Sequence, residues 1–387
     1  MTVQAEATPV GHTRLSSSPP TTSYIADTAS IGSSRAGDYT RWLVMLLTLA
    51  AASLNGFFIS YRAALFKTVS YDTYEPYLLY ILGQPGGEIP ISPWVYRIGS
   101  VVMAAPFYKL PVMSMNGGGA GEVLAGTETI QYVRATQAIC FANYFYLSLA
   151  CLLVFFYCRN RLKLPDETCF IGAVIMFVLY HLNGPMISVE GLAVLPLVIL
   201  AITVFERKLL AFSLTVLVSA SINEKIVMVA LLMVGLRLLF WKHDRRFYAT
   251  ATVVSVIALL AYILVVYMLR FPGNENHTDP TTYVDSALRL LKENTFTLKG
   301  LYMTVWPILL LVGLWFIGMT VPRSRRLVVG SDLGVILGMV VIAFGLAVTN
   351  IGRIAVYSAA IVTIAATPAL APRSASRNPE RAALKRE

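Results

Sequence analysis

The stretch Tyr71–Tyr108, YDTYEPYLLYILGQPGGEIPISPWVYRIGSVVMAAPFY, is polar and aromatic and separates two strongly apolar segments of the chain. It places Asp72 and Glu75, a turn-rich Gly/Pro run and Arg97 directly after the first apolar segment. A membrane protein that keeps ionisable groups beside its bilayer spans usually has a chemical reason to do so. The rest of the chain is therefore interpreted around this stretch.

The composition predicts a membrane protein. Of the 387 residues, 56% are hydrophobic and only 13% are charged, which leaves too little polar surface for a soluble chain of this length. Apolar runs of about 17–25 residues, the length that spans a bilayer as a helix, recur along the sequence. A β-barrel is excluded because its strands alternate in polarity. We expect an all-α, polytopic transmembrane helical bundle of about ten or eleven spans in the cell (inner or plasma) membrane.

Tails and spans divide the chain into three regions. Residues 1–41, rich in Ser, Thr, Pro and Ala, are expected to form a disordered cytoplasmic tail. Residues 42–370 form the transmembrane domain, and residues 371–387 form a basic cytoplasmic tail. Within the domain we expect spans at 42–60, 132–157, 168–182, 187–205, 209–222, 225–241, 247–269, 300–320, 331–349 and 353–370.

The net charge of +10 comes largely from short basic clusters at span ends. Such clusters mark cytoplasmic connectors that contact anionic lipid, so we expect membrane lipids and no nucleic acid among the partners. When all of them are placed inside, residues 270–300 become a large outer loop. The clusters are Arg159–Lys163, Arg207–Lys208, Lys242–Arg246 and Arg323–Arg326.

Two threadings are open for the chain after the first span. If the N-terminal tail is inside, residues 61–131 form the first outer loop and Trp94–Met113 does not cross the membrane. If Trp94–Met113 crosses, the tail is outside and the acidic residues are cytoplasmic. An arginine, a lysine and two prolines interrupt this segment, which suits a helix at the membrane interface better than a span. We favour the first threading.

Asp72 and Glu75 are the candidate catalytic pair. They share one face if Tyr71–Leu82 is helical, because they are three residues apart. Paired carboxylates at a membrane surface suit a general base, a divalent-cation ligand or both, and Tyr74 and its neighbours could stack on a sugar ring. The alternative is an interfacial tyrosine belt with solvated acids. No motif specifies another cofactor or a particular metal, so a divalent cation is the cofactor that the sequence leaves open.

The candidate binding residues lie in several segments. Arg97 and Arg353 each suit either an interfacial anchor or a phosphate clamp. Glu224 and Lys225, at the outer end of an expected span, are either its solvated end or a polar lining that meets the first loop. His277, in the second outer loop, is either solvated or joins a site from above.

These segments together resemble the GT-C superfamily of membrane glycosyltransferases, especially its bacterial polyprenyl-phosphate-sugar-dependent members. Tyr71-Asp72-Thr73-Tyr74 stands where the family has an acidic motif, and Tyr71–Leu82 and Trp94–Met113 stand where it has two juxtamembrane helices. The chain has no clear Asp-x-Asp or Glu-x-Asp, in which it departs from the family. Further stretches that resemble the family are Ser92–Arg97, Ser221–Lys225 and Gly352-Arg353.

The resemblance implies a GT-C-like fold and an inverting glycosyltransferase. Asp72 would act as base on an acceptor hydroxyl, and Arg97 and Arg353 would hold the leaving phosphate. The implied partners are a lipid-phosphate sugar donor and a glycan or lipid acceptor. Three other functions stay open: a transporter or flippase for a lipid-linked or anionic substrate, a non-catalytic membrane subunit of a polysaccharide assembly complex, and an integral polymerase or ligase of cell-surface glycans.

Overall fold

The computed structural model describes most of the chain, and every regular element in the described part is helical. By its internal contacts the chain divides into two units, Met1–Thr48 and Leu49–Glu387, and all packing discussed below lies within the second unit. The described residues are 26–65, 74–90, 96–111, 130–181, 190–240, 244–268, 292, 297–321, 327, 329–345 and 354–371.

The first helix, α1 (Ala26–Leu65), is longer than the span expected there. Its apolar part, Arg41–Ala64, agrees with the expected span at 42–60. The helix begins at Ala26, however, so the boundary of the expected disordered tail needs correction over residues 26–41. No proline follows Pro20 in this region, and the backbone therefore meets no residue that would stop the helix from extending towards the N-terminus.

The other expected spans correspond to helices whose ends lie within a few residues of the expected bounds, except that residues 346–353 lie outside the described part. Each begins or ends beside a basic connector or a polar residue, as the sequence indicated. These helices are α5 (Ile130–Asn160), α6 (Asp166–His181), α7 (Glu190–Phe205), α8 (Leu209–Ile222), α9 (Glu224–Phe240), α10 (Arg245–Met268), α12 (Leu298–Met319), α13 (Gly330–Gly345) and α15 (Ala359–Ala366), the last flanked by the 3₁₀ turns η5 (Val356–Ser358) and η6 (Thr367–Leu370).

Three helices in the described part of the chain are long and apolar enough to cross a membrane: Arg41–Ala64, Gln131–Asn160 and Arg245–Val266. Several others are apolar but shorter. The 14 residues of α8, for example, extend about 21 Å, less than the roughly 30 Å of a bilayer's hydrocarbon core. The structure thus shows membrane-type helices without establishing the full number of spans.

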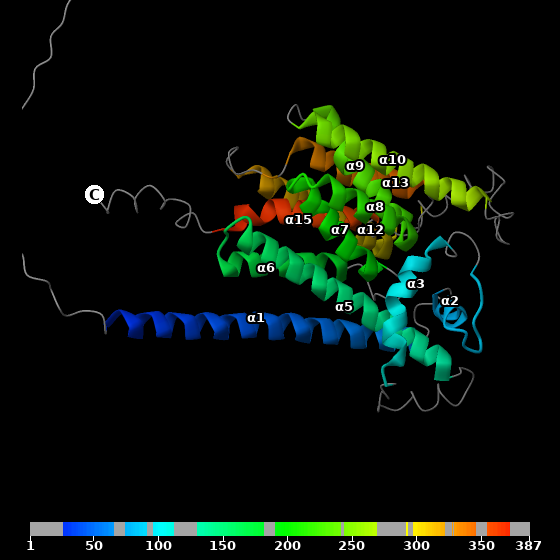
Figure 1. Ribbon diagram of the computed structural model, residues 1–387, viewed down its shortest axis with the longest axis horizontal. Helices are drawn as coiled ribbons and strands as arrows, with labels where there is room; N and C mark the ends of the chain where they lie inside the picture. Colours follow the sequence, from blue (N-terminus) through cyan, green and yellow to red (C-terminus); the bar gives the residue numbers. More distant parts are fainter. Residues whose placement is uncertain are drawn as a thin grey trace, which may run out of the picture. The chain divides into compact units, whose positions relative to one another are not determined.

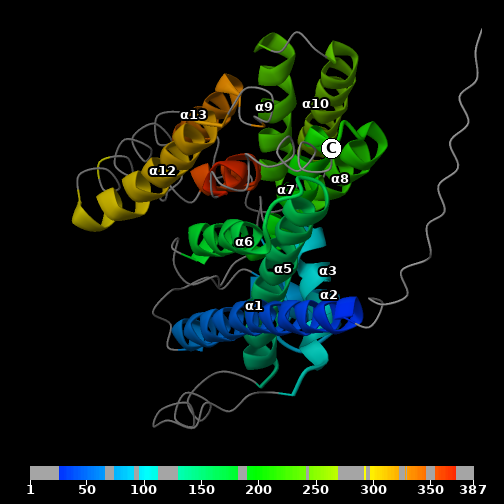
Figure 2. The same cartoon turned by 90° about the vertical axis from the view of Figure 1, so that its left-hand side faces the viewer.

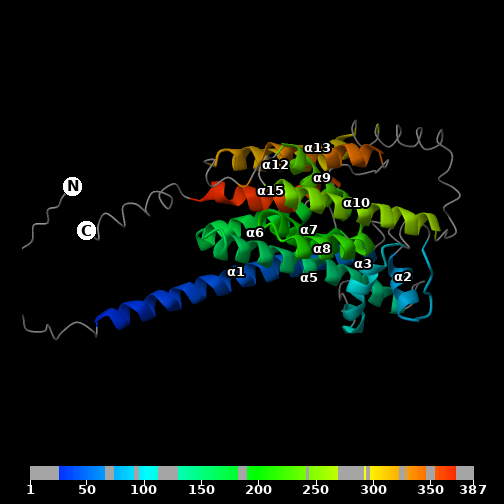
Figure 3. The same ribbon diagram turned by 45° about the horizontal axis from the view of Figure 1, so that its top comes forward.

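Buried helices form the centre of the second unit. The side chains of α15 are buried along its whole length, and most of those of α7 are buried as well. Figure 3 shows α15 between α12 on one side and α6 and α7 on the other, while Figure 2 shows α9 beside α10 and α12 beside α13. A helix that other helices surround can be apolar all round, which explains why α7 and α15 have no polar face.

Ion pairs bring the basic connectors together at one end of the bundle. Arg159 pairs with Asp166 at 2.8 Å, across the turn between α5 and α6. The same turn is joined to the end of α7 by Arg161 and Glu206, at 3.3 Å. A third pair, Arg207 with Asp244 at 3.0 Å, joins the α7–α8 turn to the start of α10. Three of the four connectors that were expected to be cytoplasmic therefore share one end, and the fourth, Arg323–Arg326, lies outside the described residues.

The first loop begins and ends at the opposite end of the bundle. The part of α1 after Leu49 runs antiparallel to α5, because Ser53 contacts Ser148 (2.5 Å) and Ser60 contacts Tyr144 (3.1 Å). Between them lie α2 (Tyr74–Ile81), α3 (Ile98–Ala104) and the 3₁₀ turn η2 (Ala105–Lys109), packed on the first half of α5 (Figure 1). Helical residues 98–109 extend only about 18 Å, too short for a span. This arrangement agrees with a first loop that does not cross.

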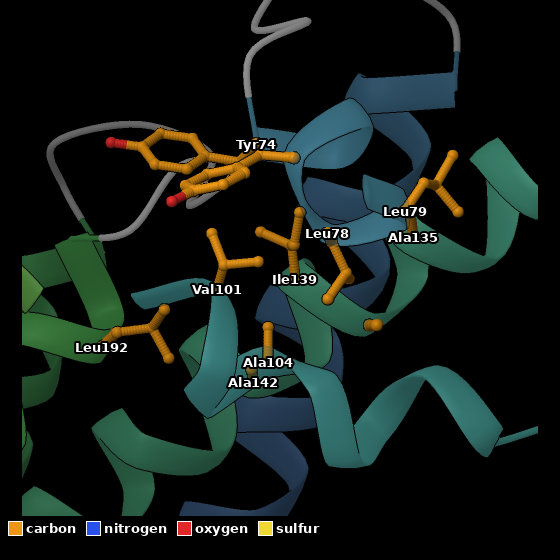
Figure 4. Close-up of a cluster of buried hydrophobic side chains, with 11 residues drawn as sticks. Tyr74, Leu78, Leu79, Val101, Ala104, Ala135, Ile139, Ala142 and Leu192 are labelled. Carbon is orange, nitrogen blue, oxygen red and sulfur yellow. The ribbon is translucent and has the colours of Figure 1, made fainter. Parts of the chain in front are cut away.

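A small hydrophobic core fixes α2 and α3 against α5 (Figure 4). It is built from side chains of all three helices together with Leu192 at the start of α7. After α2, the chain turns back at Gly83 and Gly86, whose φ angles of +62° and +78° favour glycine. The core side chains labelled in Figure 4 are Tyr74, Leu78, Leu79, Val101, Ala104, Ala135, Ile139, Ala142 and Leu192.

Candidate functional site

The backbone of α3 lies directly against the junction of α8 and α9. A Cβ added to Gly99 would be 2.5 Å from Ser221 Oγ and 2.9 Å from Ser221 O, so only glycine permits this approach. One residue further on, Ser100 Oγ donates a hydrogen bond of 2.6 Å to the carbonyl of Ile222. These contacts place the residue just before α3, Arg97, beside the first turn of α9.

Asn223 forms the junction itself. It is extended (φ −164°, ψ 124°), so α8 ends and a new helix begins at Glu224. Its Oδ1 accepts a hydrogen bond of 3.1 Å from Lys225 N, as an N-cap side chain does, and its Nδ2 donates to Tyr357 Oη at 2.9 Å. The start of α9 is thereby tied to the η5 turn near the C-terminal helix.

Arg97 and Glu224 form a buried, two-pronged ion pair. Arg97 Nε donates to Glu224 Oε2 at 2.9 Å and Nη2 donates to Oε1 at 2.5 Å, while Nη1 donates to Tyr74 Oη at 2.9 Å. The exposed fraction is 9% for the Arg97 side chain and 10% for that of Glu224. Parallel hydrogen bonds between a guanidinium and a carboxylate are among the strongest polar contacts in proteins. They join α2, α3 and α9, three elements far apart in sequence.

The electrostatics keep both partners charged. Burial by itself lowers the pKa of Arg97, but the Glu224 carboxylate and the Tyr74 hydroxyl raise it well above its ordinary value. Burial by itself raises the pKa of Glu224, but Arg97 and then Lys225 lower it to about 2. Tyr262 of α10 also lies near enough to the Glu224 carboxylate to interact with it electrostatically. Glu224 is therefore a permanent anion at neutral pH and unsuited to act as a general base.

Lys225 adds a second cation beside this pair. Its Nζ lies 3.8 Å from Glu224 Oε1, and its side chain is 12% exposed. Arg97 and Lys225 contribute two positive charges and Glu224 one negative charge, so these three described groups sum to one positive charge. We call Tyr74, Arg97, Glu224 and Lys225 the cationic cluster. Four candidate site residues from three separate sequence segments thus come together.

The remaining candidate residues lie elsewhere or outside the described part. Glu75 follows Tyr74 on α2 but is buried on the side of α5, where its carboxylate acts electrostatically on Cys140. Asp72, His277 and Arg353 are outside the described residues, so their positions relative to the cationic cluster stay predictions. The expected role of Glu75 beside Asp72 is likewise a prediction.

A second buried ion pair was not anticipated from the sequence. Arg237 near the end of α9 donates to both carboxylate oxygens of Asp332 on α13, with Nη2 at 3.0 Å and 3.2 Å. The guanidinium also lies 5.2 Å from the ring centroid of Phe205, while Asp332 Oδ2 accepts a hydrogen bond from Val329 N. The charges of Arg237 and Asp332 cancel, and the two side chains are 5% and 1% exposed. The signal in the sequence was Arg237 itself, a single arginine within an apolar run, which would need a buried partner.

The described residues do not form a recognisable metal site. In the part of the chain that the structure covers, no three His, Cys, Asp or Glu side chains gather closely enough to hold a metal ion. A divalent cation at Asp72 is thus a matter for experiment. Compared with known proteins, the chain matches no family model, no curated protein and no solved structure.

Proposed function

We propose that this chain is an integral-membrane glycosyltransferase of GT-C-like fold, with about ten or eleven membrane spans. In this proposal it moves a sugar from a polyprenyl-phosphate donor to a cell-surface glycan or lipid acceptor at the outer face of the cell membrane. The observation that carries it is the cationic cluster. A buried site with surplus positive charge suits a phosphate group. One residue of this site, Tyr74, is only two positions after Asp72 in the sequence.

In the proposed chemistry, the segment that contains Asp72 removes a proton, and the cationic cluster stabilises the leaving phosphate. Asp72 removes the proton from an acceptor hydroxyl, whose oxygen attacks the anomeric carbon of the sugar. The bond between that carbon and the phosphate oxygen breaks with inversion, and the lipid phosphate leaves with the bonding electrons. Fixed cations near the phosphate stabilise the negative charge that it gains.

The second buried pair bears on the carrier alternative. A transporter or flippase needs to receive its anionic substrate at both ends of the bundle. The Arg237–Asp332 pair sits at the far end of α9 from the cationic cluster, but its charges cancel and its side chains are almost wholly buried. It therefore offers an anion no surplus charge, so this pair is not the second anion site that a carrier would need.

The test is transfer activity of the purified full-length chain in nanodiscs. The assay supplies a panel of polyprenyl-phosphate monosaccharides and follows release of polyprenyl phosphate. We expect one donor to be consumed, and Asp72→Asn to reduce the rate by about a hundredfold or more while donor binding persists, because a general base typically contributes 10²–10⁴-fold. Glu167→Gln, a first-turn acid of α6 at the opposite end, serves as the matched control and should retain activity.

The result that contradicts the proposal is equally specific. Unchanged turnover in Asp72→Asn would remove the base from the mechanism. Donor binding without turnover by the wild-type chain, with any acceptor tried, would favour a carrier or an accessory subunit.

A further inference from the structure

The side-chain donors of the cationic cluster are unequally engaged. Arg97 uses all three of its nitrogen atoms, two towards Glu224 and one towards Tyr74. Lys225 differs, since its Nζ stands 3.8 Å from the carboxylate, beyond hydrogen-bond distance. Among the described residues, no side-chain or backbone acceptor forms a hydrogen bond with this ammonium group.

Exchanging partners at Arg97 would be costly. A phosphate that took the place of Glu224 on the guanidinium would leave a buried carboxylate without its main counter-charge. Of the cations that the structure describes, Lys225 would then be the nearest remaining positive charge, at 3.8 Å. The Arg97–Glu224 pair is therefore better suited to act as a fixed support than as the group that receives and releases an anion at each turnover.

We propose that Lys225 is the residue that receives the phosphate group of the substrate, and that the Arg97–Glu224 pair positions it. This inference rests on the proposed function and assigns a different residue from the arginine that the sequence favoured. An ammonium on a flexible stem binds phosphate as a point charge, so it can follow the group as it leaves.

In this proposal the phosphate is attached to an apolar chain, which would find exposed apolar side chains near the cluster. Three elements near the cluster each have an exposed apolar side chain. One follows Arg97 in the sequence, one lies about a turn before Ile222, and one follows Tyr262. These are Ile98 of α3, Val218 of α8 and Ile263 of α10, which are 47%, 62% and 52% exposed. A free phosphate ion gains nothing from such neighbours, whereas an amphiphile buries them.

The experiment measures binding of three probes to the full-length chain in nanodiscs. The probes are farnesyl phosphate, the neutral alcohol farnesol, and inorganic phosphate. The variants are Lys225→Met, Lys225→Arg and the control Lys163→Met, an exposed lysine at the opposite end of the bundle. We expect the wild-type chain to prefer farnesyl phosphate to farnesol, and inorganic phosphate to compete weakly.

Lys225→Met should weaken binding of farnesyl phosphate by about 10- to 100-fold, the typical effect of losing a charge-assisted hydrogen bond, and leave farnesol binding unchanged. Lys225→Arg should retain most of the affinity, and Lys163→Met all of it. As a measurement that needs no variant, farnesyl phosphate should slow the labelling of Lys225 by an amine-reactive reagent, read by mass spectrometry.

The outcomes separate the two proposals. If the wild-type chain prefers the phosphate and Lys225→Met binds it equally well, the assignment of Lys225 is overturned while the glycosyltransferase proposal stands. If the wild-type chain does not distinguish farnesyl phosphate from farnesol, both fail. If inorganic phosphate binds as tightly as farnesyl phosphate, the ligand is a free anion and the lipid part of the inference is wrong.

Discussion

Glu224 lies between two cations, and this position links the stability of the protein to pH. Its pKa in the folded chain is lowered to about 2, below the ordinary value of 4.5. A carboxyl group with a lowered folded pKa stabilises the fold above its unfolded pKa, and that contribution is lost as the pH falls from about 4.5 towards 2. The residue thus predicts acid sensitivity in a defined window.

We expect the melting temperature of the wild-type chain in detergent to vary little from pH 7 to pH 5 and to decrease below about pH 4.5. Glu224→Gln removes the titrating group, so its melting temperature should be lower at neutral pH and should decrease less between pH 5 and pH 3. Thermal unfolding of both proteins across this range gives the comparison. Parallel curves for the two proteins would show that Glu224 does not contribute to the acid sensitivity.

At the scale of the elements, buried ion pairs join helices that are distant in sequence. Arg97 and Glu224 are 127 positions apart, and Arg237 and Asp332 are 95 apart. The apolar runs indicated where nearly every helix begins and ends, because hydrophobic length is a local property of the sequence. The two pairings depend on the register in which helices pack, which no local pattern encodes. The sequence therefore predicted Arg97, Glu224 and Lys225 as site candidates. It did not predict that Arg97 donates two hydrogen bonds to Glu224.

The Arg237–Asp332 pair should behave as a buried clamp between α9 and α13. Removing one partner of a buried pair typically costs about 3–5 kcal/mol, because the other charge is left without compensation. We expect Arg237→Met and Asp332→Asn each to destabilise the chain by about this amount, and the double variant to lose much less than the sum. Chemical unfolding in micelles measures all three.

The matched control for this cycle is Arg159 with Asp166, whose side chains are 40% and 29% exposed. Solvent screens such a pair, so Arg159→Met and Asp166→Asn should each cost about 1 kcal/mol or less. Equal losses at the two sites, or simple additivity at Arg237 and Asp332, would show that the buried pair does not act as a unit.

At the scale of the whole molecule, the basic connectors and the candidate site lie at different ends of the bundle. Three basic connectors in the described part of the chain gather at one end through ion pairs, whereas the cationic cluster, α2 and α3 lie at the other. Because basic connectors remain on the cytoplasmic side, the segment that contains Asp72 should be outside the cell. The antiparallel contacts between the second half of α1 and α5 support the same threading.

Cysteine labelling in intact cells tests this orientation. All four native cysteines are buried and can be replaced by alanine to give a cysteine-free background. On that background we expect a membrane-impermeant thiol reagent to label Asp72→Cys from outside, and to label Lys163→Cys only after the cells are permeabilised. Both variants lie in connecting segments, so they report position more than packing. The reverse pattern would place the acidic segment in the cytoplasm, where a lipid-linked sugar presented at the outer face cannot reach it. A carrier or an accessory subunit would then explain the cationic cluster better than a glycosyltransferase.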